Sequence, residues 1–145
     1  CRLIVDRLRV PPTSAQPCWV LERRWNPRPA AIPDLLAIWR PTRENPGRFL
    51  ALEIDTGTEA IRRTLIPRLV ALADTLVPFA GTAPAFISVL TKGPRRVTAI
   101  QQAVGSAAIA LPVVVDALPP SAGRPAFAGL QALLTVGAKS PSHPG

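Results

Sequence analysis

Residues 49–76, FLALEIDTGTEAIRRTLIPRLVALADTL, decide how this chain folds, because the spacing of their apolar side chains changes at Gly57. Before the glycine, Phe49 to Asp55 is a mostly apolar run that predicts a largely buried strand. After it, apolar residues recur at intervals of three or four, which is the stripe of an amphipathic helix. The stripe consists of Ile61, Leu65, Leu69, Leu72 and Leu76. We therefore expect a strand, a tight turn at Gly57 and a helix from about Thr58 to Leu76, kinked at Pro67.

Further elements are predicted on both sides of this stretch. Strands are expected at 18–25 and 34–40, separated by a loop with three prolines, and these two form a meander with the strand at 49–55. After residue 76, a strand is expected at 85–91, a helix at 94–104, a strand at 109–115 and a short helix at 130–136. This order of strands and helices indicates an α/β domain with a mixed central sheet flanked by helices.

Length and composition favour a single globular domain. The chain has 145 residues, of which 48% are hydrophobic and 18% charged. Its 18 prolines require many loops, which argues against a long helical bundle. We assign residues 1–136 to one domain and residues 137–145 to a disordered tail. The chain contains no methionine and starts with Cys1, so we expect it to be part of a longer protein.

Cysteine content and hydropathy favour a cytoplasmic protein without a membrane partner. Cys1 and Cys18 have neither the spacing of a zinc site nor the density of a disulfide scaffold, so we expect a reducing compartment. The most apolar stretch, Ala103 to Val115, has about 13 residues and contains Pro112, whereas roughly 20 apolar residues are needed to cross a bilayer. The sequence gives no prediction of oligomeric state.

The charge balance favours an anionic partner. Lys and Arg number 17 against 9 Asp and Glu, a formal net charge of +8 at pH 7. Nine of the 17 basic residues lie in residues 1–50, so we expect this half, with Arg23 and Arg24, to face DNA through its phosphates. A basic face that is merely solvated is the alternative.

Acidic residues are few, and several of them gather around one predicted strand. Glu53, Asp55 and Glu59 lie close together in sequence, and Asp34 starts the adjacent predicted strand. Because residues i and i+2 of a strand share a face, Glu53 and Asp55 are expected to point the same way. Carboxylates on an apolar sheet are favoured when a cation neutralises them, and oxygen ligands suit Mg²⁺ or Mn²⁺. The alternative is that the strand reaches solvent at Glu53 and that its acids are hydrated.

Two other motifs overlap this segment. Thr56 to Glu59 fits a capping box, in which the Thr56 side chain accepts from the backbone N–H of Glu59 and the Glu59 carboxylate returns to Thr56. Asp55-Thr56-Gly57 is also the tripeptide of aspartic proteases, which use two such copies. The chain has one copy, followed by helical rather than strand periodicity, so the protease hypothesis is disfavoured.

The arrangement of these residues resembles that of a known family. Pro33-Asp34, then 18 residues, then Glu53-Ile54-Asp55, followed by Thr56-Gly57-Thr58-Glu59 and a long helix, resembles the C-terminal domain of bacterial plasmid replication-relaxation proteins. Those proteins carry an E-hydrophobic-D-x-G-T-E segment at the same junction. The resemblance covers roughly residues 1 to 116 and implies a restriction-endonuclease-like core of the PD-(D/E)XK type, behind an N-terminal winged-helix region.

The resemblance also implies a function in DNA processing. Asp34 and Glu53 would bind Mg²⁺ or Mn²⁺, and Asp55 would be a further ligand or orient the attacking water. The developing charge would be stabilised by Arg62, Arg63 or Arg68. The implied partners are DNA and proteins of plasmid replication or conjugation.

One departure from the pattern leaves two hypotheses open. Nucleases of this type carry a lysine two residues after the metal-binding acid, and in this chain that position is Asp55. The relatives often have a Lys and a Tyr one turn apart on the helix, where this chain has Arg68 and Leu72. The domain is therefore either a Mg²⁺-dependent endonuclease without the motif lysine, or an inactive nuclease-like module that binds DNA or other proteins.

Overall fold

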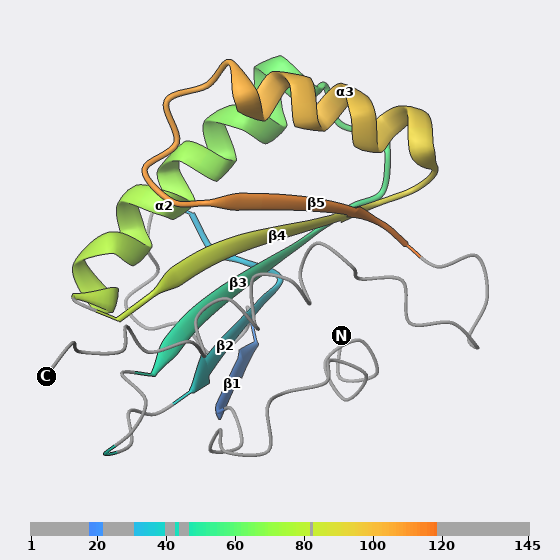
Figure 1. The fold of residues 1–145 in the computed structure, drawn as a ribbon. Helices are drawn as coiled ribbons and strands as arrows, with labels where there is room; N and C mark the ends of the chain where they lie inside the picture. Colours follow the sequence, from blue (N-terminus) through green and yellow to red (C-terminus); the bar gives the residue numbers. More distant parts are fainter. Residues whose placement is uncertain (1–17, 22–30, 40–42, 44–46, 82, 119–145) are drawn as a thin grey trace, which may run out of the picture.

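A five-stranded mixed sheet forms the centre of the molecule (Figure 1). The computed structural model describes residues 18–21, 31–39, 43, 47–81 and 83–118. The strands lie side by side in chain order: β1 (Cys18–Leu21), β2 (Leu35–Trp39), β3 (Arg48–Asp55), β4 (Ala85–Thr91) and β5 (Val113–Ala117). β1, β2 and β3 form an antiparallel meander, and β4 and β5 continue the sheet in parallel with β3. The predicted α/β class, mixed sheet and meander are confirmed.

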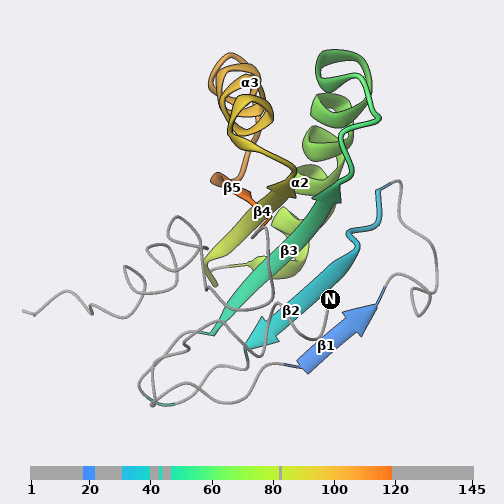
Figure 2. The same ribbon diagram turned by 90° about the vertical axis from the view of Figure 1, so that its right-hand side faces the viewer.

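Two helical connections cover the same face of this sheet. A π-helical turn, η2 (Ile61–Leu65), and α2 (Ile66–Ala80) link β3 to β4, and α3 (Pro94–Gly105) links β4 to β5. Parallel neighbours require such crossovers, and crossovers of one hand that advance in the same direction along a sheet place their helices on one face. Figure 2 shows α2 and α3 side by side above the strands.

The sheet buries apolar side chains on both faces. Toward the helices, Ala51 of β3, Ile87 and Val89 of β4 and Val115 of β5 pack with the helical stripe. This stripe includes Leu65, Leu69, Leu72 and Leu76, together with Ile100 of α3. The opposite face carries a second buried cluster, formed by Leu35, Ala37, Trp39, Leu50, Leu52 and Leu90. Because Ala51 and Leu52 fall in different clusters, the alternation along β3 places Glu53 and Asp55 on the helix-covered face, as the period of two predicts.

Element boundaries agree best where proline and strand periodicity define them. β4 has the predicted bounds, and α3 starts at the predicted Pro94. The last strand is displaced: the prediction was 109–115, whereas β5 runs from Val113 to Ala117. The apolar residues before Pro112 do not pair with β4, whose ladder with β5 starts at Ile87 opposite Val113. Apolar character alone therefore predicted the wrong start for this strand. The strand starts after Pro112, because proline has no N–H to donate to the ladder.

The start of the long helix differs from the prediction. Helical structure begins at Ile61, after an extended Ala60, and no side chain caps it. The capping-box interpretation of Thr56 and Glu59 is therefore wrong. Pro67 lies in the first turn of α2, where proline is tolerated, and the helical run from Ile61 to Ala80 changes from π to α geometry just before it. The wide π turn lies directly before this proline, which has no N–H and crowds the carbonyl four residues earlier.

Some predictions concern residues outside the described part of the chain. These are residues 22–25 of the first strand, the helix at 130–136 and the tail at 137–145. Within the described part, no helix combines the length and apolar character that a membrane crossing requires.

Candidate functional site

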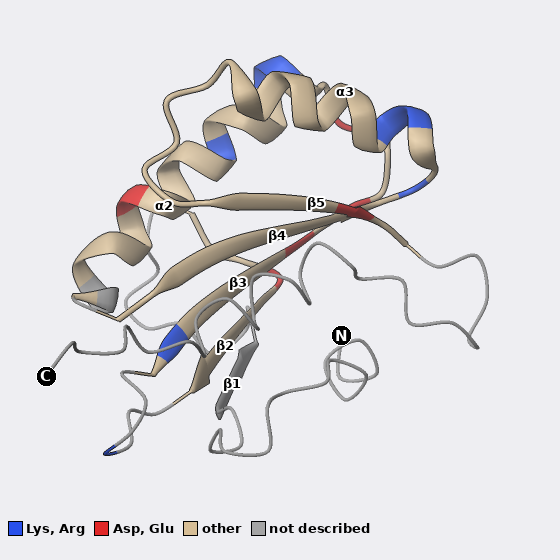
Figure 3. Ribbon diagram, viewed as in Figure 1, with Lys and Arg blue, Asp and Glu red and all other residues tan. Residues whose placement is uncertain are grey.

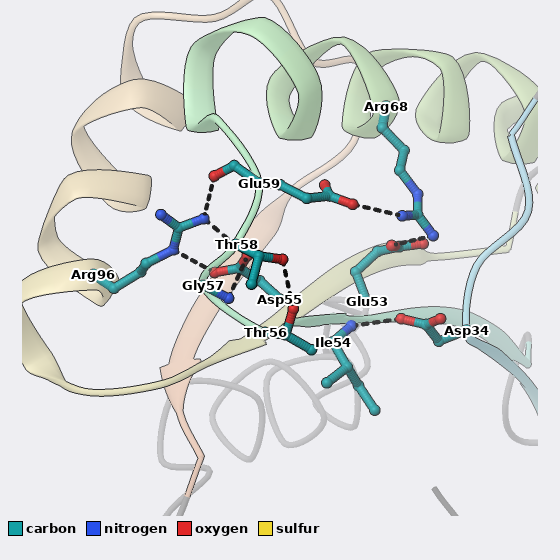
Figure 4. A network of polar contacts seen from close by, with 10 residues as sticks. All are labelled: Asp34, Glu53, Ile54, Asp55, Thr56, Gly57, Thr58, Glu59, Arg68 and Arg96. Atoms are coloured by element: carbon teal, nitrogen blue, oxygen red, sulfur yellow. Dashed lines mark hydrogen bonds and ion pairs between the residues drawn. The ribbon is translucent and has the colours of Figure 1, made fainter.

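Charged residues gather where β3 ends and the following helix begins (Figure 3). Glu53 and Asp55 lie on the helix-covered face of β3, so each meets a basic side chain from a helix above it. Arg68 of α2 pairs with Glu53, and Arg96 of α3 pairs with Asp55 (Figure 4). The predicted acidic segment is therefore joined to two different helices.

Asp55 is held by a dense set of hydrogen bonds. Arg96 donates from Nε to Oδ2 at 2.6 Å and from Nη2 to Oδ1 at 2.9 Å, a two-pronged pairing. The Thr91 hydroxyl donates to Oδ2 at 2.5 Å, and the Gly57 N–H donates to Oδ1 at 3.1 Å. The hydrogen bonds from Arg96, and next those from Thr91 and Gly57, outweigh the effect of burial and lower the pKa of Asp55 to about 2. Asp55 is thus a buried, ionised carboxylate in an ion pair.

Arg96 also fixes the turn that follows β3. Its Nη2 donates to the backbone carbonyl of Glu59 at 2.7 Å. Within the same turn, Gly57 has φ +87°, a conformation that side chains with a Cβ rarely adopt. The predicted tight turn at Gly57 is therefore confirmed. Through Arg96, the end of β3, this turn and the first turn of α3 are tied together.

Glu53 is a buried acid that faces Arg68. Its Oε2 lies 3.0 Å from Nη2 of Arg68, whose Nη1 lies 3.8 Å from Oε1 of Glu59. Only 2% of Glu53 is exposed, so the alternative of a hydrated acid at this position is wrong. Burial raises its pKa to about 8 although Arg68 acts in the opposite direction, and the charges of Asp34 and Glu59 contribute to the increase. The Oε1 atom is buried without a hydrogen-bond partner among the described residues.

Asp34, the residue before β2, accepts a hydrogen bond from the backbone of β3. Its Oδ2 accepts a hydrogen bond of 2.7 Å from the N–H of Ile54. The ladder between β2 and β3 starts at Leu35 opposite Leu52, so the Asp34 carboxylate extends the pairing by satisfying a donor beyond that ladder. This structural contact uses one of the two carboxylate oxygens of Asp34.

The residues fit a divalent ion only in part. The predicted set of Asp34, Glu53 and Asp55 is not brought together, because both oxygens of Asp55 are engaged by Arg96, Thr91 and Gly57. In the described ranges, no three His, Cys, Asp or Glu side chains are grouped so that they could hold a metal. Asp34 and Glu53 remain neighbours with oxygen ligands of the kind that suits Mg²⁺ or Mn²⁺. The three-carboxylate centre that the sequence suggests does not fit this geometry.

The predicted DNA-contacting arginines have different surroundings. Arg62 and Arg63 are exposed on η2, whereas Arg68 forms ion pairs with Glu53 and Glu59. Arg23 and Arg24 lie outside the described residues. Arg96, which pairs with Asp55, was not among the site residues predicted from the sequence. Its position in the first turn of a helix that directly follows the strand beside β3 is the signal that could have identified it.

No family model, no curated protein and no solved structure matches this chain. The resemblance to replication-relaxation proteins therefore stays a hypothesis that rests on the quoted motif.

Proposed function

We propose that this chain is a DNA-binding domain of a plasmid or mobile-element replication-relaxation protein, with a restriction-endonuclease-like core that no longer cleaves DNA. One observation favours a binding module over a nuclease: both carboxylate oxygens of Asp55 accept hydrogen bonds from Arg96, Thr91 and Gly57. An acid held in this way contributes to the fold and has no oxygen left for a metal or a water. We also propose that the protein is cytoplasmic and that its partners include plasmid replication or conjugation proteins.

The internal pairing of the acids is compatible with DNA binding. Arg96 balances the charge of Asp55, and Arg68 and the raised pKa reduce the negative charge at Glu53. Acids whose charge is neutralised by ion pairs inside the protein repel a phosphate backbone less than hydrated acids do. The chain as a whole keeps a formal net charge of +8, which favours association with a polyanion.

A metal-dependent nuclease is the second candidate, and one observation favours it. Glu53 is buried, has a raised pKa and carries an oxygen without a hydrogen-bond partner among the described residues, next to Asp34. Buried acids with shifted pKa values are frequent at functional sites. Asp34 and Glu53 are the residues that would hold a divalent ion and place it against a phosphate.

A nicking assay separates the two candidates. The protein is incubated with supercoiled plasmid and Mg²⁺ or Mn²⁺, alongside Asp34→Asn and Glu53→Gln variants and an EDTA control. We expect all three proteins to shift the DNA on a gel and to leave it supercoiled. Nicking that requires the metal and both acids would instead establish the nuclease, and a lack of any shift at low salt would refute DNA binding.

A further inference from the structure

Exposed basic side chains are concentrated at one end of the sheet, where β3 and β4 end. Arg62 and Arg63 lie on η2, Lys92 in the turn after β4 and Arg95 in the first turn of α3, and all four are exposed. Both helical segments start at this end because each follows the carboxyl end of a parallel strand. Figure 3 shows basic positions at the start of both. We call these four residues the basic edge.

The described acids at this end form no ion pair with the basic edge, and one of them, Asp34, accepts a hydrogen bond from the N–H of Ile54. Asp55 is buried and paired with Arg96, and Glu59 faces Arg68. Asp116 is also near this end, but its register partner is Leu90, so it lies on the face opposite the helices. Among the described residues, no ion pair involves any member of the basic edge.

The backbone adds positive potential at the same place. Neither η2 nor α3 has an acidic residue in its first turn or a side chain that caps it. The first N–H groups of a helix carry partial positive charge and favour anions. This contribution has the same sign as that of the four side chains.

Among the side chains that the structure describes, the aromatic ones that could stack on bases lie away from the basic edge. The aromatic residues whose side chains the structure describes are Trp39, at the end of β2, and Phe49 and Phe86, near the starts of β3 and β4. Since β2 runs antiparallel to β3, all three lie at the end of the sheet away from the basic edge. A charged surface with no aromatic neighbour among the described side chains suits a sugar-phosphate backbone rather than unpaired bases.

We propose that the basic edge, formed by Arg62, Arg63, Lys92 and Arg95, is the surface on which the phosphodiester backbone of duplex nucleic acid docks. This inference rests on the proposed function and locates its contact surface. Arg96 is a positioning residue: it turns inward to Asp55 and Glu59 and thereby fixes the first turn of α3, from which Arg95 points outward. Binding through such contacts depends strongly on salt and only weakly on sequence.

Fluorescence anisotropy with the full chain tests the surface. The probes are a labelled DNA duplex and an RNA duplex of the same sequence, each at 50 and 200 mM salt. Four phosphate contacts alone would weaken binding by about 150-fold between these concentrations. Replacing all four residues by alanine should make the log–log salt dependence shallower by about four.

A matched pair of charge reversals provides the control. Arg95→Glu should weaken binding by about 10-fold or more at 50 mM salt, because a repulsive charge replaces a phosphate contact. Arg43 is exposed in the connection between β2 and β3, at the opposite end of the sheet, so Arg43→Glu changes the net charge equally and should weaken binding by less than about 3-fold. Thermal melts of both variants establish that they fold.

The outcomes separate this inference from the function on which it rests. Binding to DNA that is unaffected by the four substitutions, or equal losses in Arg95→Glu and Arg43→Glu, would overturn the basic edge and leave the DNA-binding proposal intact. Edge-dependent binding to RNA alone would support the surface and refute the DNA proposal. Binding to neither duplex at 50 mM salt would overturn both.

Discussion

Arg96, in the first turn of α3, binds both carboxylate oxygens of Asp55 at the end of β3, although 41 positions separate the two residues. The same guanidinium reaches the carbonyl of Glu59 in the turn between β3 and η2. One side chain thus joins the two places at which the chain leaves the sheet for a helix. The contact explains why an acid in an apolar strand is compatible with the fold.

Removing the Asp55 carboxylate should destabilise the domain strongly. Asp55→Ala leaves the Arg96 guanidinium, the Thr91 hydroxyl and the Gly57 N–H without their acceptor. Loss of one partner of a buried ion pair costs about 3 kcal/mol or more in the free energy of unfolding, which urea denaturation would measure. Asp74→Ala on the exposed side of α2 is the control and should change it by less than about 0.5 kcal/mol. Similar values for the two variants would contradict the role assigned to Asp55.

Asp55 should also make stability depend on pH in the acid range. Its pKa in the folded protein is lowered to about 2, below the value of about 3.9 expected for an unfolded chain. The stabilisation is therefore fully present above about pH 4 and is lost as the pH falls through about 2, amounting to about 2 kcal/mol. Urea denaturation at a series of pH values should show the difference between wild type and Asp55→Asn shrinking over this interval. A constant difference from pH 5 to pH 2 would argue against the lowered pKa.

Glu53 should act in the opposite direction and at higher pH. Its pKa is raised to about 8 in the folded protein, so its contribution to stability is fully present below about pH 4.3 and is lost as the pH rises through about 8. Glu53→Gln cannot ionise, and it should gain stability relative to wild type between pH 5 and pH 9. Thermal melts at both pH values measure this gain, and NMR titration of the Glu53 carboxyl would report the pKa directly. If Glu53→Gln instead becomes less stable relative to wild type between pH 5 and pH 9, the ionised Glu53–Arg68 pair is favourable.

Gly57 should tolerate alanine poorly, in contrast to a glycine of α3. Gly57 has φ +87°, where a Cβ is strained, and Gly57→Ala should lower the free energy of unfolding by about 1–2 kcal/mol. Gly105 has no positive φ and nothing within 4 Å of an added Cβ, so Gly105→Ala should be neutral or stabilising by up to about 1 kcal/mol. Chemical denaturation of the two variants would test this difference in sign. Equal effects would mean that the turn after β3 relaxes without cost.

The local elements of residues 49–105 could be predicted from the sequence. The apolar run before Gly57, the stripe after it and Pro94 at a helix start depend on neighbouring residues only, so β3, α2, β4 and α3 could be predicted. The common face of Glu53 and Asp55 followed from the strand period for the same reason. β5 could not be placed correctly, because pairing with β4 decides where it starts.

The contacts of the acids depend on tertiary packing. The direction of the two crossovers brings both helices over the face that carries Glu53 and Asp55, and it thereby supplies Arg68 to one acid and Arg96 to the other. Neither partner is fixed by local spacing, since the ion pair of Asp55 spans 41 positions and depends on where α3 starts above the sheet. The sequence therefore identified the acidic cluster, whereas packing made it an internally paired site and left the basic side chains at the end of the sheet exposed.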